Sequence, residues 1–183
     1  PYLNMLVDNS EDKIEMALRV AIAGNIIDLA AKPDFDVKEE VKKITSDIIE
    51  LPALQDFKES LLNSKMILYI ADNYEEALFD KILLKQLTGK EVIFAVRSKS
   101  IFNDITREDA YQLGIDEICS VIESGSMIAG TDLKEVNQLF SEYYEKADLI
   151  IAKGQGNFET LHNSHKPVFF LFKVKCEVIA QRS

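Results

Sequence analysis

The chain has 183 residues, enough to bury one sizeable hydrophobic core, so we expect a single domain. Hydrophobic residues make up 47% of it and charged residues 28%, an ordinary balance for a globular protein in water. The formal net charge of −10 argues against duplex nucleic acid as a partner, because phosphate would be repelled. A local cationic pocket or a bound metal would still admit a small anion.

The sequence also argues against a membrane or secreted protein. The longest unbroken apolar run, Met66–Ala71, falls far short of the ~20 residues that cross a bilayer, and the chain shows no secretory signal. Cys119 and Cys176 are too few for a disulfide framework, which favours a reducing, cytoplasmic location. No pattern in the sequence predicts the oligomeric state.

Residues 1–64 are predicted to form a helical layer. The spacing of apolar residues indicates a helix over 11–31. Two amphipathic helices are expected over 36–50 and 53–63, separated by Pro52.

Residues 65–183 alternate between predicted strands and predicted helices. Such alternation implies a parallel sheet joined by right-handed crossover helices. The expected fold class is therefore α/β, a three-layer α/β/α Rossmann-like domain with a mostly parallel sheet and additional N-terminal helices. The predicted strands are Met66–Ala71, Glu91–Val96, Glu117–Ile122, Asp148–Ala152 and Val168–Phe172, and the predicted helices are Glu75–Leu87, Arg107–Leu113 and Leu133–Lys146.

The segment Lys153-Gly154-Gln155-Gly156-Asn157-Phe158-Glu159 directly follows the fourth predicted strand. Ligands of open α/β sheets bind at such carboxyl ends of strands. Two glycines let the backbone approach a ligand closely, and the Lys153 ammonium is a point charge suited to phosphate. A plain strand-to-helix turn with a solvated lysine explains the same heptapeptide equally well.

Two pairs of acid and amide residues follow neighbouring strands. Asp72-Asn73 ends the first strand of the α/β part, and Asn103-Asp104 follows the second strand after Arg97 and a short loop. Two carboxylates and an Asn carbonyl form an all-oxygen ligand set that suits Mg²⁺ or Mn²⁺. Since Asp and Asn are common in turns, either pair alone is better explained as part of a turn. Two pairs at the same edge of the sheet favour a metal site.

Two further segments are weaker candidates. Glu123-Ser124-Gly125-Ser126 ends the third strand, with Gly130-Thr131 close behind, and hydroxyls beside glycine amides can form an anion-binding nest. A flexible loop followed by a helix cap is the alternative. Gly24-Asn25 interrupts a good helix, so either another element packs closely there or Asn25 reaches into a site.

Taken in order along the chain, these segments resemble the damage-control phosphatases, and most closely their short archaeal-type members. The resemblance covers about residues 17–180. It is carried by Ala23-Gly24-Asn25-Ile26-Ile27-Asp28, Asp72-Asn73, Arg97 with Asn103-Asp104, Glu123-Ser124-Gly125-Ser126 with Gly130-Thr131, Lys153–Glu159, and Lys173-Val174-Lys175-Cys176.

The resemblance implies a phosphohydrolase that depends on a divalent metal (Mg, Mn, Co or Ni) and removes phosphate from a small phosphorylated metabolite. By motif match, Asp72, Asn73 and Asp104 would hold the metal, and Lys153 would hold the phosphate. Asp72, Asp104 and Lys153 would carry catalysis, with water attack and direct attack by an aspartate both open. The further substrate-binding candidates are Asn25, Arg97, Ser124, Gly125, Ser126, Asn157 and Glu159.

The chain departs from the family pattern in two places. Where the family usually has Asp-Asn-Ala-Gly-Glu, this chain has Asp72-Asn73-Tyr74-Glu75-Glu76, which puts a bulky ring and an extra acid beside the expected metal. Arg97 is followed by Ser98-Lys99-Ser100 and not by a Gly-Pro-containing sequence. The chain opens on Pro1, and we expect it to be a fragment that lacks the family's N-terminal helical segment, which often carries a Cys pair.

Two other function classes stay open. Members of the family have also been proposed to methylate protein carboxyl groups, but a methyl donor usually needs a glycine-rich turn after the first strand, which Asp72–Glu75 lacks. A non-catalytic phosphometabolite-binding module would keep Lys153 but would need no metal.

Overall fold

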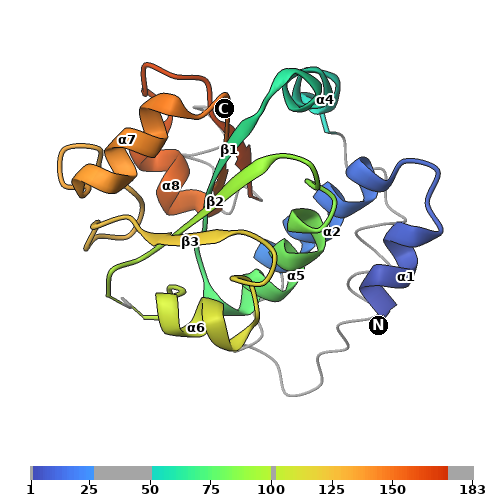
Figure 1. The fold of residues 1–183 in the computed structure, drawn as a ribbon, viewed down its shortest axis with the longest axis horizontal. Helices are drawn as coiled ribbons and strands as arrows, with labels where there is room; N and C mark the ends of the chain where they lie inside the picture. Colours follow the sequence, from blue (N-terminus) through green and yellow to red (C-terminus); the bar gives the residue numbers. More distant parts are fainter. Residues whose placement is uncertain (1, 27–50, 100–101, 173–183) are drawn as a thin grey trace.

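The computed structural model describes residues 2–26, 51–99 and 102–172. Within these residues, five parallel strands form one sheet in the order β3-β2-β1-β4-β5 (Figure 1). This confirms the expected α/β class. The strands are β1 (Met66–Ile70), β2 (Glu91–Val96), β3 (Ser120–Glu123), β4 (Leu149–Lys153) and β5 (Phe169–Leu171).

Helices cover both faces of the sheet and complete three layers (Figure 1). One hydrophobic cluster joins the sheet to the first group of helices, and a second cluster joins the opposite face to the other two. The first group is α1 (Tyr2–Asp8), α2 (Lys13–Ile26), α4 (Leu54–Asn63), α5 (Tyr74–Leu84) and α6 (Arg107–Gln112), and the second is α7 (Gln138–Lys146) and α8 (Gly154–Leu161).

Strand β4 shows how the alternation of side chains assigns residues to these layers. Leu149 and Ile151 belong to the cluster under α2 and α5, whereas Ile150 and Ala152 belong to the cluster under α7 and α8. Because successive side chains of a strand point to opposite faces, Lys153 continues on the α2 and α5 side.

The strand order fixes where a ligand would bind. Strand β1 lies between β2 and β4, so the chain runs outward from β1 in one direction through β2 and β3 and later in the other through β4 and β5. Ligands of such sheets bind outside the carboxyl ends of the strands at this switch in direction. In this protein it lies where β1 and β4 end, at Asp72 and Gly154.

The glycine inside helix α2 has a packing reason. A Cβ at Gly24 would lie 2.9 Å from Cβ of Phe79 on α5, so the two helices approach too closely there for a larger residue. Of the two explanations offered by the sequence, close packing holds at Gly24. The next residue, Asn25, is buried and also contacts α5, as described below.

Several predicted elements differ from the structure. The third strand begins at Ser120 and not Glu117, because 116–118 form a turn, and α7 begins at Gln138 and not Leu133, because Asn137 caps it. Helices α1 and α8 were not predicted as such. The helix predictions for 27–31 and 36–50, and the motif at 173–176, lie outside the described residues. In the part of the chain that the structure describes, no helix is long and apolar enough to cross a bilayer.

Candidate functional site

The two acid and amide pairs lie side by side at the carboxyl edge of the sheet. An isolated antiparallel bridge pairs Asn73 with Asp104. It is flanked by hydrogen bonds from the Tyr74 amide to the Asn103 carbonyl at 2.8 Å and from the Ile105 amide to the Asp72 carbonyl at 3.0 Å. The backbone itself therefore holds both predicted pairs together.

Asp72 sits against the start of helix α8. A Cβ on Gly154 would lie 1.8 Å from Oδ2 of Asp72, so only a glycine admits the carboxylate at this position. The net effect of its surroundings raises the pKa of Asp72 to about 7, and burial is the largest cause. The Glu76 and Asp104 carboxylates also raise this pKa, while Arg97 and Lys153 lower it.

Glu76, on the first turn of α5, connects several candidates. Its Oε1 accepts hydrogen bonds from Nδ2 of Asn25 at 2.9 Å and from Nδ2 of Asn73 at 3.0 Å. Its Oε2 lies 3.0 Å from Nζ of Lys153. Because Nδ2 of Asn73 faces Glu76, the amide oxygen Oδ1 is the atom that remains for a metal ion.

Lys153 is not accessible at the sheet edge, although both interpretations of its heptapeptide, a phosphate contact and a solvated lysine, require an accessible ammonium. The side chain is fully buried, and its ammonium donates to the Ala21 carbonyl at 2.9 Å and to Oδ1 of Asp80 at 2.6 Å, besides the ion pair with Glu76. Asp80 and Glu76 raise the pKa of Lys153, against the lowering effect of burial, so the ammonium stays charged. A direct contact with phosphate stays a prediction.

Arg97, Thr131 and Asn157 form a second buried network. Nη1 of Arg97 donates to Oγ1 of Thr131 at 3.1 Å, and Nη2 donates to Oδ1 of Asn157 at 3.4 Å. The Thr131 hydroxyl also donates to Oδ1 of Asn157, at 2.8 Å. Nε of Arg97 lies 3.8 Å from Oδ1 of Asp104. This network ties the metal-ligand candidate Asp104 to helix α8.

The loop after β3 satisfies its own polar groups. The Gly125 amide donates to Oγ of Ser98 at 2.9 Å, the Ser126 amide donates to Oγ of Ser124 at 3.3 Å, and the Ser126 hydroxyl donates to the Gly130 carbonyl at 3.1 Å. An anion would have to displace these bonds to occupy the nest that the sequence suggested.

The two remaining predictions for this region concern Glu159 and Tyr74. Glu159 is exposed and accepts a hydrogen bond from Gln155, so it does not join either buried network. Tyr74 keeps 36% of its surface exposed. The extra acid Glu75 accepts a hydrogen bond from Nδ2 of Asn103 at 3.1 Å, which helps to fix the segment that carries Asp104.

The atoms that could hold a metal are all oxygens, the kind of ligand that a hard divalent cation prefers. Among the described residues, the site holds two cationic side chains and four carboxylates, which give a net charge of −2 when all are ionised. No group of three or more His, Cys, Asp or Glu side chains placed to hold a metal occurs in those residues, and the predicted set consists of two carboxylates and one amide. The cations are Arg97 and Lys153, and the carboxylates are Asp72, Glu76, Asp80 and Asp104.

The sequence analysis gave no site role to Glu76 or Asp80, and it named Thr131 only with the loop after the third strand. A signal existed for the two acids, because Glu76 and Asp80 are four residues apart on a predicted helix and so share one face. That face also carries buried apolar residues. Because an unpaired buried carboxylate is costly in free energy, two acids on a buried face predict a cationic partner nearby.

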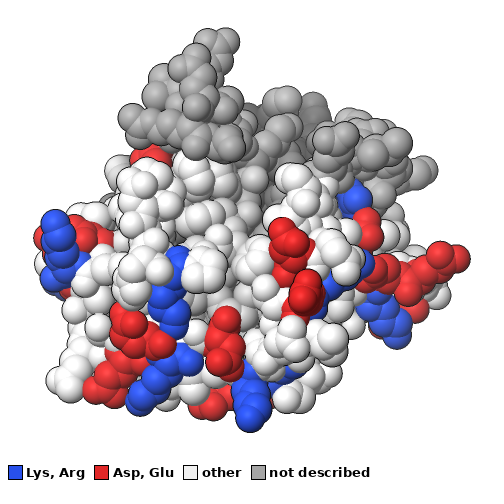
Figure 2. Space-filling view, turned by 90° about the horizontal axis from the view of Figure 1, so that it is seen from above, with Lys and Arg blue, Asp and Glu red and all other residues white. Residues whose placement is uncertain are grey.

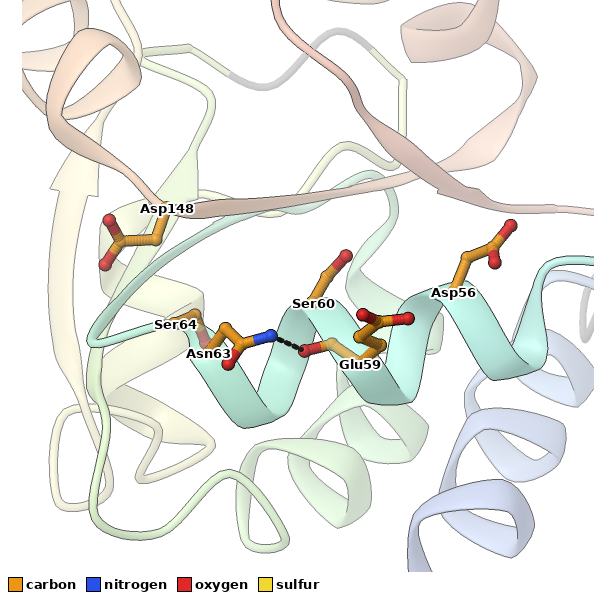
Figure 3. Close-up of a pocket in the computed structure, with 6 residues that line it drawn as sticks. All are labelled: Asp56, Glu59, Ser60, Asn63, Ser64 and Asp148. Carbon is orange, nitrogen blue, oxygen red and sulfur yellow. Dashed lines mark hydrogen bonds between the residues drawn. The ribbon is translucent and has the colours of Figure 1, made fainter.

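A different pocket lies at the opposite, amino-terminal end of the sheet (Figure 3). It has a volume of about 360 Å³ and is lined by Asp56, Glu59, Ser60, Asn63, Ser64 and Asp148. Oδ2 of Asp148 accepts hydrogen bonds from the Lys65 and Met66 amides at 2.8 and 2.9 Å. These bonds lower the pKa of Asp148 and join the starts of β4 and β1.

Comparison with known proteins places the chain in a family. The family model of the damage-control phosphatase ARMT1-like domain matches residues 1–183. The chain therefore belongs to the damage-control phosphatase ARMT1-like family, as its motifs indicated.

Individual relatives agree with this assignment. A damage-control phosphatase of Pyrococcus horikoshii is 40% identical over 173 residues, which cover 91% of this chain and 60% of the relative. A damage-control phosphatase of Archaeoglobus fulgidus is 31% identical over 189 residues, covering 99% of this chain and 65% of that protein.

A solved structure is also similar. The crystal structure of a DUF89 family protein from P. horikoshii superposes with a TM-score of 0.87 at 36% identity, covering 98% of this chain and 66% of that one. The chain thus spans about three fifths of the length of the curated relatives that it matches.

Proposed function

We propose that the protein is a phosphohydrolase that depends on a divalent metal and releases phosphate from a small phosphorylated metabolite. One observation carries the proposal: Asp72, Asn73 and Asp104 meet at the carboxyl edge of the sheet, within a buried group of charges that is negative overall. Two relatives named damage-control phosphatases support the reaction class.

In this proposal Asp72, Asn73 and Asp104 hold Mg²⁺, Mn²⁺, Co²⁺ or Ni²⁺, since all three offer oxygen ligands. A bound metal would neutralise phosphoryl oxygens and activate or orient a water. The Asn73 amide is oriented for this task by its hydrogen bond to Glu76.

The protein's own groups would handle the phosphate. Helix α8 begins at Gly154, beside Asp72, and the N–H groups of a first helical turn have no intrahelical partners and attract anions. The buried charges of Arg97 and Lys153 would stabilise negative charge that develops on the transferring group. Lys153 would have to turn away from Asp80 or Glu76 to contact the phosphate.

The test is phosphate release by the full-length protein across a panel of phosphorylated metabolites, after chelation and after each metal is added back. We expect no turnover without metal and loss of turnover in Asp72→Asn and Asp104→Asn. Asp148→Asn, at the other end of the sheet, is the matched control and should keep wild-type rates. Phosphate release that survives exhaustive chelation would overturn the metal assignment.

A further inference from the structure

The side-chain amide of Asn157 makes all of its hydrogen bonds to other groups of the protein. The residue is fully buried in the first half of α8. Its Nδ2 donates to the Lys153 carbonyl at 2.8 Å and to the Ala71 carbonyl at 3.1 Å. Its Oδ1 accepts from Thr131 and from Arg97. An Asn side chain has two donor hydrogens and two acceptor lone pairs, so every position is filled.

The two carbonyls that Nδ2 binds lie at the ends of adjacent strands. The β1–β4 ladder has its last pair at Ile70 and Ala152. One residue further on, the Asn157 amide bridges Ala71 and Lys153 where the ladder no longer does. The next residues of the two strands are Asp72 and Gly154, which touch each other. The amide therefore sets the spacing at which the Asp72 carboxylate is held.

Oδ1 of Asn157 also contacts the residue that follows a third strand, β2. Arg97 directly follows β2, and its guanidinium is held by Thr131 and Asn157. With the guanidinium held by these two hydrogen bonds, its Nε lies 3.8 Å from Oδ1 of Asp104. One side chain thus links the carboxyl ends of β1, β4 and β2, which carry or contact Asp72 and Asp104.

We propose that Asn157 is a positioning residue, which sets the geometry of Asp72 and Arg97 without touching the substrate. The inference rests on the proposed function and replaces the direct substrate contact that the sequence suggested. A substrate could reach the Asn157 amide only by breaking one of its four buried hydrogen bonds. A misplacement of about 1 Å at such a site can reduce turnover on the order of 10²-fold.

The chain offers a matched control. Asp148 also joins β4 to β1 through two bonds between one side chain and the backbone, but at the amino ends of the strands (Figure 3). Asn157→Ala and Asp148→Ala each remove one such bridge between the same two strands. Asn157→Asp keeps the volume and the acceptors but loses both donors.

The kinetic measurement uses the full-length protein with para-nitrophenyl phosphate and Mn²⁺. We expect both Asn157 variants to lower kcat about 10- to 100-fold with little change in KM, and Asp148→Ala to stay within about 2-fold of wild type. In an Arg97→Lys background, Asn157→Ala should cost at least about 5-fold less than in the wild type, because the two residues act together. An additive effect, or a rise in KM with kcat unchanged, would overturn the proposal.

A second measurement tests the position of Arg97 and does not require the protein to have phosphatase activity. In the ¹H–¹⁵N spectrum of the metal-free protein, the Arg97 Nε–H resonance should move in both Asn157 variants and stay in place in Asp148→Ala. An unmoved resonance would overturn the proposal, and it would do so even if the wild type hydrolyses no phosphate ester. If Asn157→Ala does not fold, Asn157→Asp, which keeps the volume of the side chain, provides both measurements with the same expected outcomes.

Discussion

At the level of single residues, the contact between Gly154 and Asp72 is the tightest constraint on the site. Gly154 has a φ of +78°, which side chains rarely adopt, and it has no room for a Cβ because the Asp72 carboxylate occupies that space. The glycine therefore serves both the turn into α8 and the placement of the carboxylate.

Gly154→Ala should be more destabilising than its backbone conformation alone explains. Gly89 has a φ of +82° but nothing within 4 Å of the point where a Cβ would lie, so Gly89→Ala measures the conformational cost alone, roughly 1–2 kcal/mol. We expect urea unfolding to give a clearly larger loss for Gly154→Ala, together with weaker Mn²⁺ binding. Equal losses in the two variants would show that the Asp72 carboxylate moves aside freely.

The raised pKa of Asp72 predicts how stability depends on pH in the metal-free protein. The folded pKa of about 7 lies above the ordinary value of 3.8, so the folded state binds the proton more tightly than the unfolded state does. Stability should therefore fall as pH rises from about 4 to 7, by at most ~1.4 kcal/mol per pH unit from this group.

Asp72→Asn should reduce this slope in denaturant titrations between pH 4 and 7, and the slope that remains below about pH 6 belongs to Asp80, whose pKa is also raised. Asp148 should have the opposite effect on how stability depends on pH. Hydrogen bonds to its carboxylate lower its pKa, so the stability that it contributes is lost as pH falls. Asp148→Asn should thus lower stability at pH 7 and leave the Asp72 slope intact. A slope unchanged by Asp72→Asn would mean that another group carries it.

At the level of elements, a buried ion cluster joins α5 to β4 and α2. Asp80 and Glu76 come from one face of α5, Lys153 ends β4, and the Ala21 carbonyl belongs to α2. Burial raises the pKa of Asp80 to about 6 even though the Lys153 charge lowers it. The lysine therefore supplies the positive charge that faces two carboxylates between the layers.

Lys153→Met should destabilise the fold by roughly 3–5 kcal/mol, because it leaves buried carboxylates without their cation. Lys146→Met is the control, since Lys146 pairs with Glu142 on the exposed side of α7 and such pairs contribute at most ~0.5 kcal/mol. The free energies come from urea unfolding at pH 7. A loss below about 1 kcal/mol for Lys153→Met would contradict the stabilising role of this buried ion cluster.

The same cluster shows what the sequence could and could not predict. The alternation of Leu149, Ile151 and Lys153 along a strand was enough to turn the lysine toward the helical layer and not toward solvent. We expected an exposed ammonium because the motif at the strand end was considered without this alternation. Asp80 lies 73 residues away, so its pairing with Lys153 depends on how α5 packs, which local spacing does not reveal.

At the level of the whole molecule, fold class was predictable because alternating strands and helices leave few ways to bury their apolar faces. The proximity of the two acid and amide pairs was also predictable, because both follow strands that lie side by side in the sheet. The hydrogen bonds that link Asn157 to other elements were not predictable, because three of its four bonds join residues 26 to 86 positions apart.

The formal net charge of the chain is −10. On the face that Figure 2 views from above, the described Lys and Arg residues are interspersed with Asp and Glu. Nonspecific attraction of cations to such a mixed surface is weak and is screened by salt. A specific site should instead respond to a divalent cation at low concentration, whatever the ionic strength.

We therefore expect Mn²⁺ or Mg²⁺ to raise the melting temperature of the whole protein. A ligand at 100 times its Kd stabilises the folded state by about 2.7 kcal/mol, which for a chain of this length corresponds to roughly 5–10 °C. The shift should vanish on chelation and in Asp104→Asn, persist in Asp148→Asn, and be absent when NaCl supplies the same ionic strength. A shift that survives Asp104→Asn but disappears in Asp148→Asn would place the cation in the acidic pocket at the other end of the sheet, because Asp56 and Glu59 line that pocket as well.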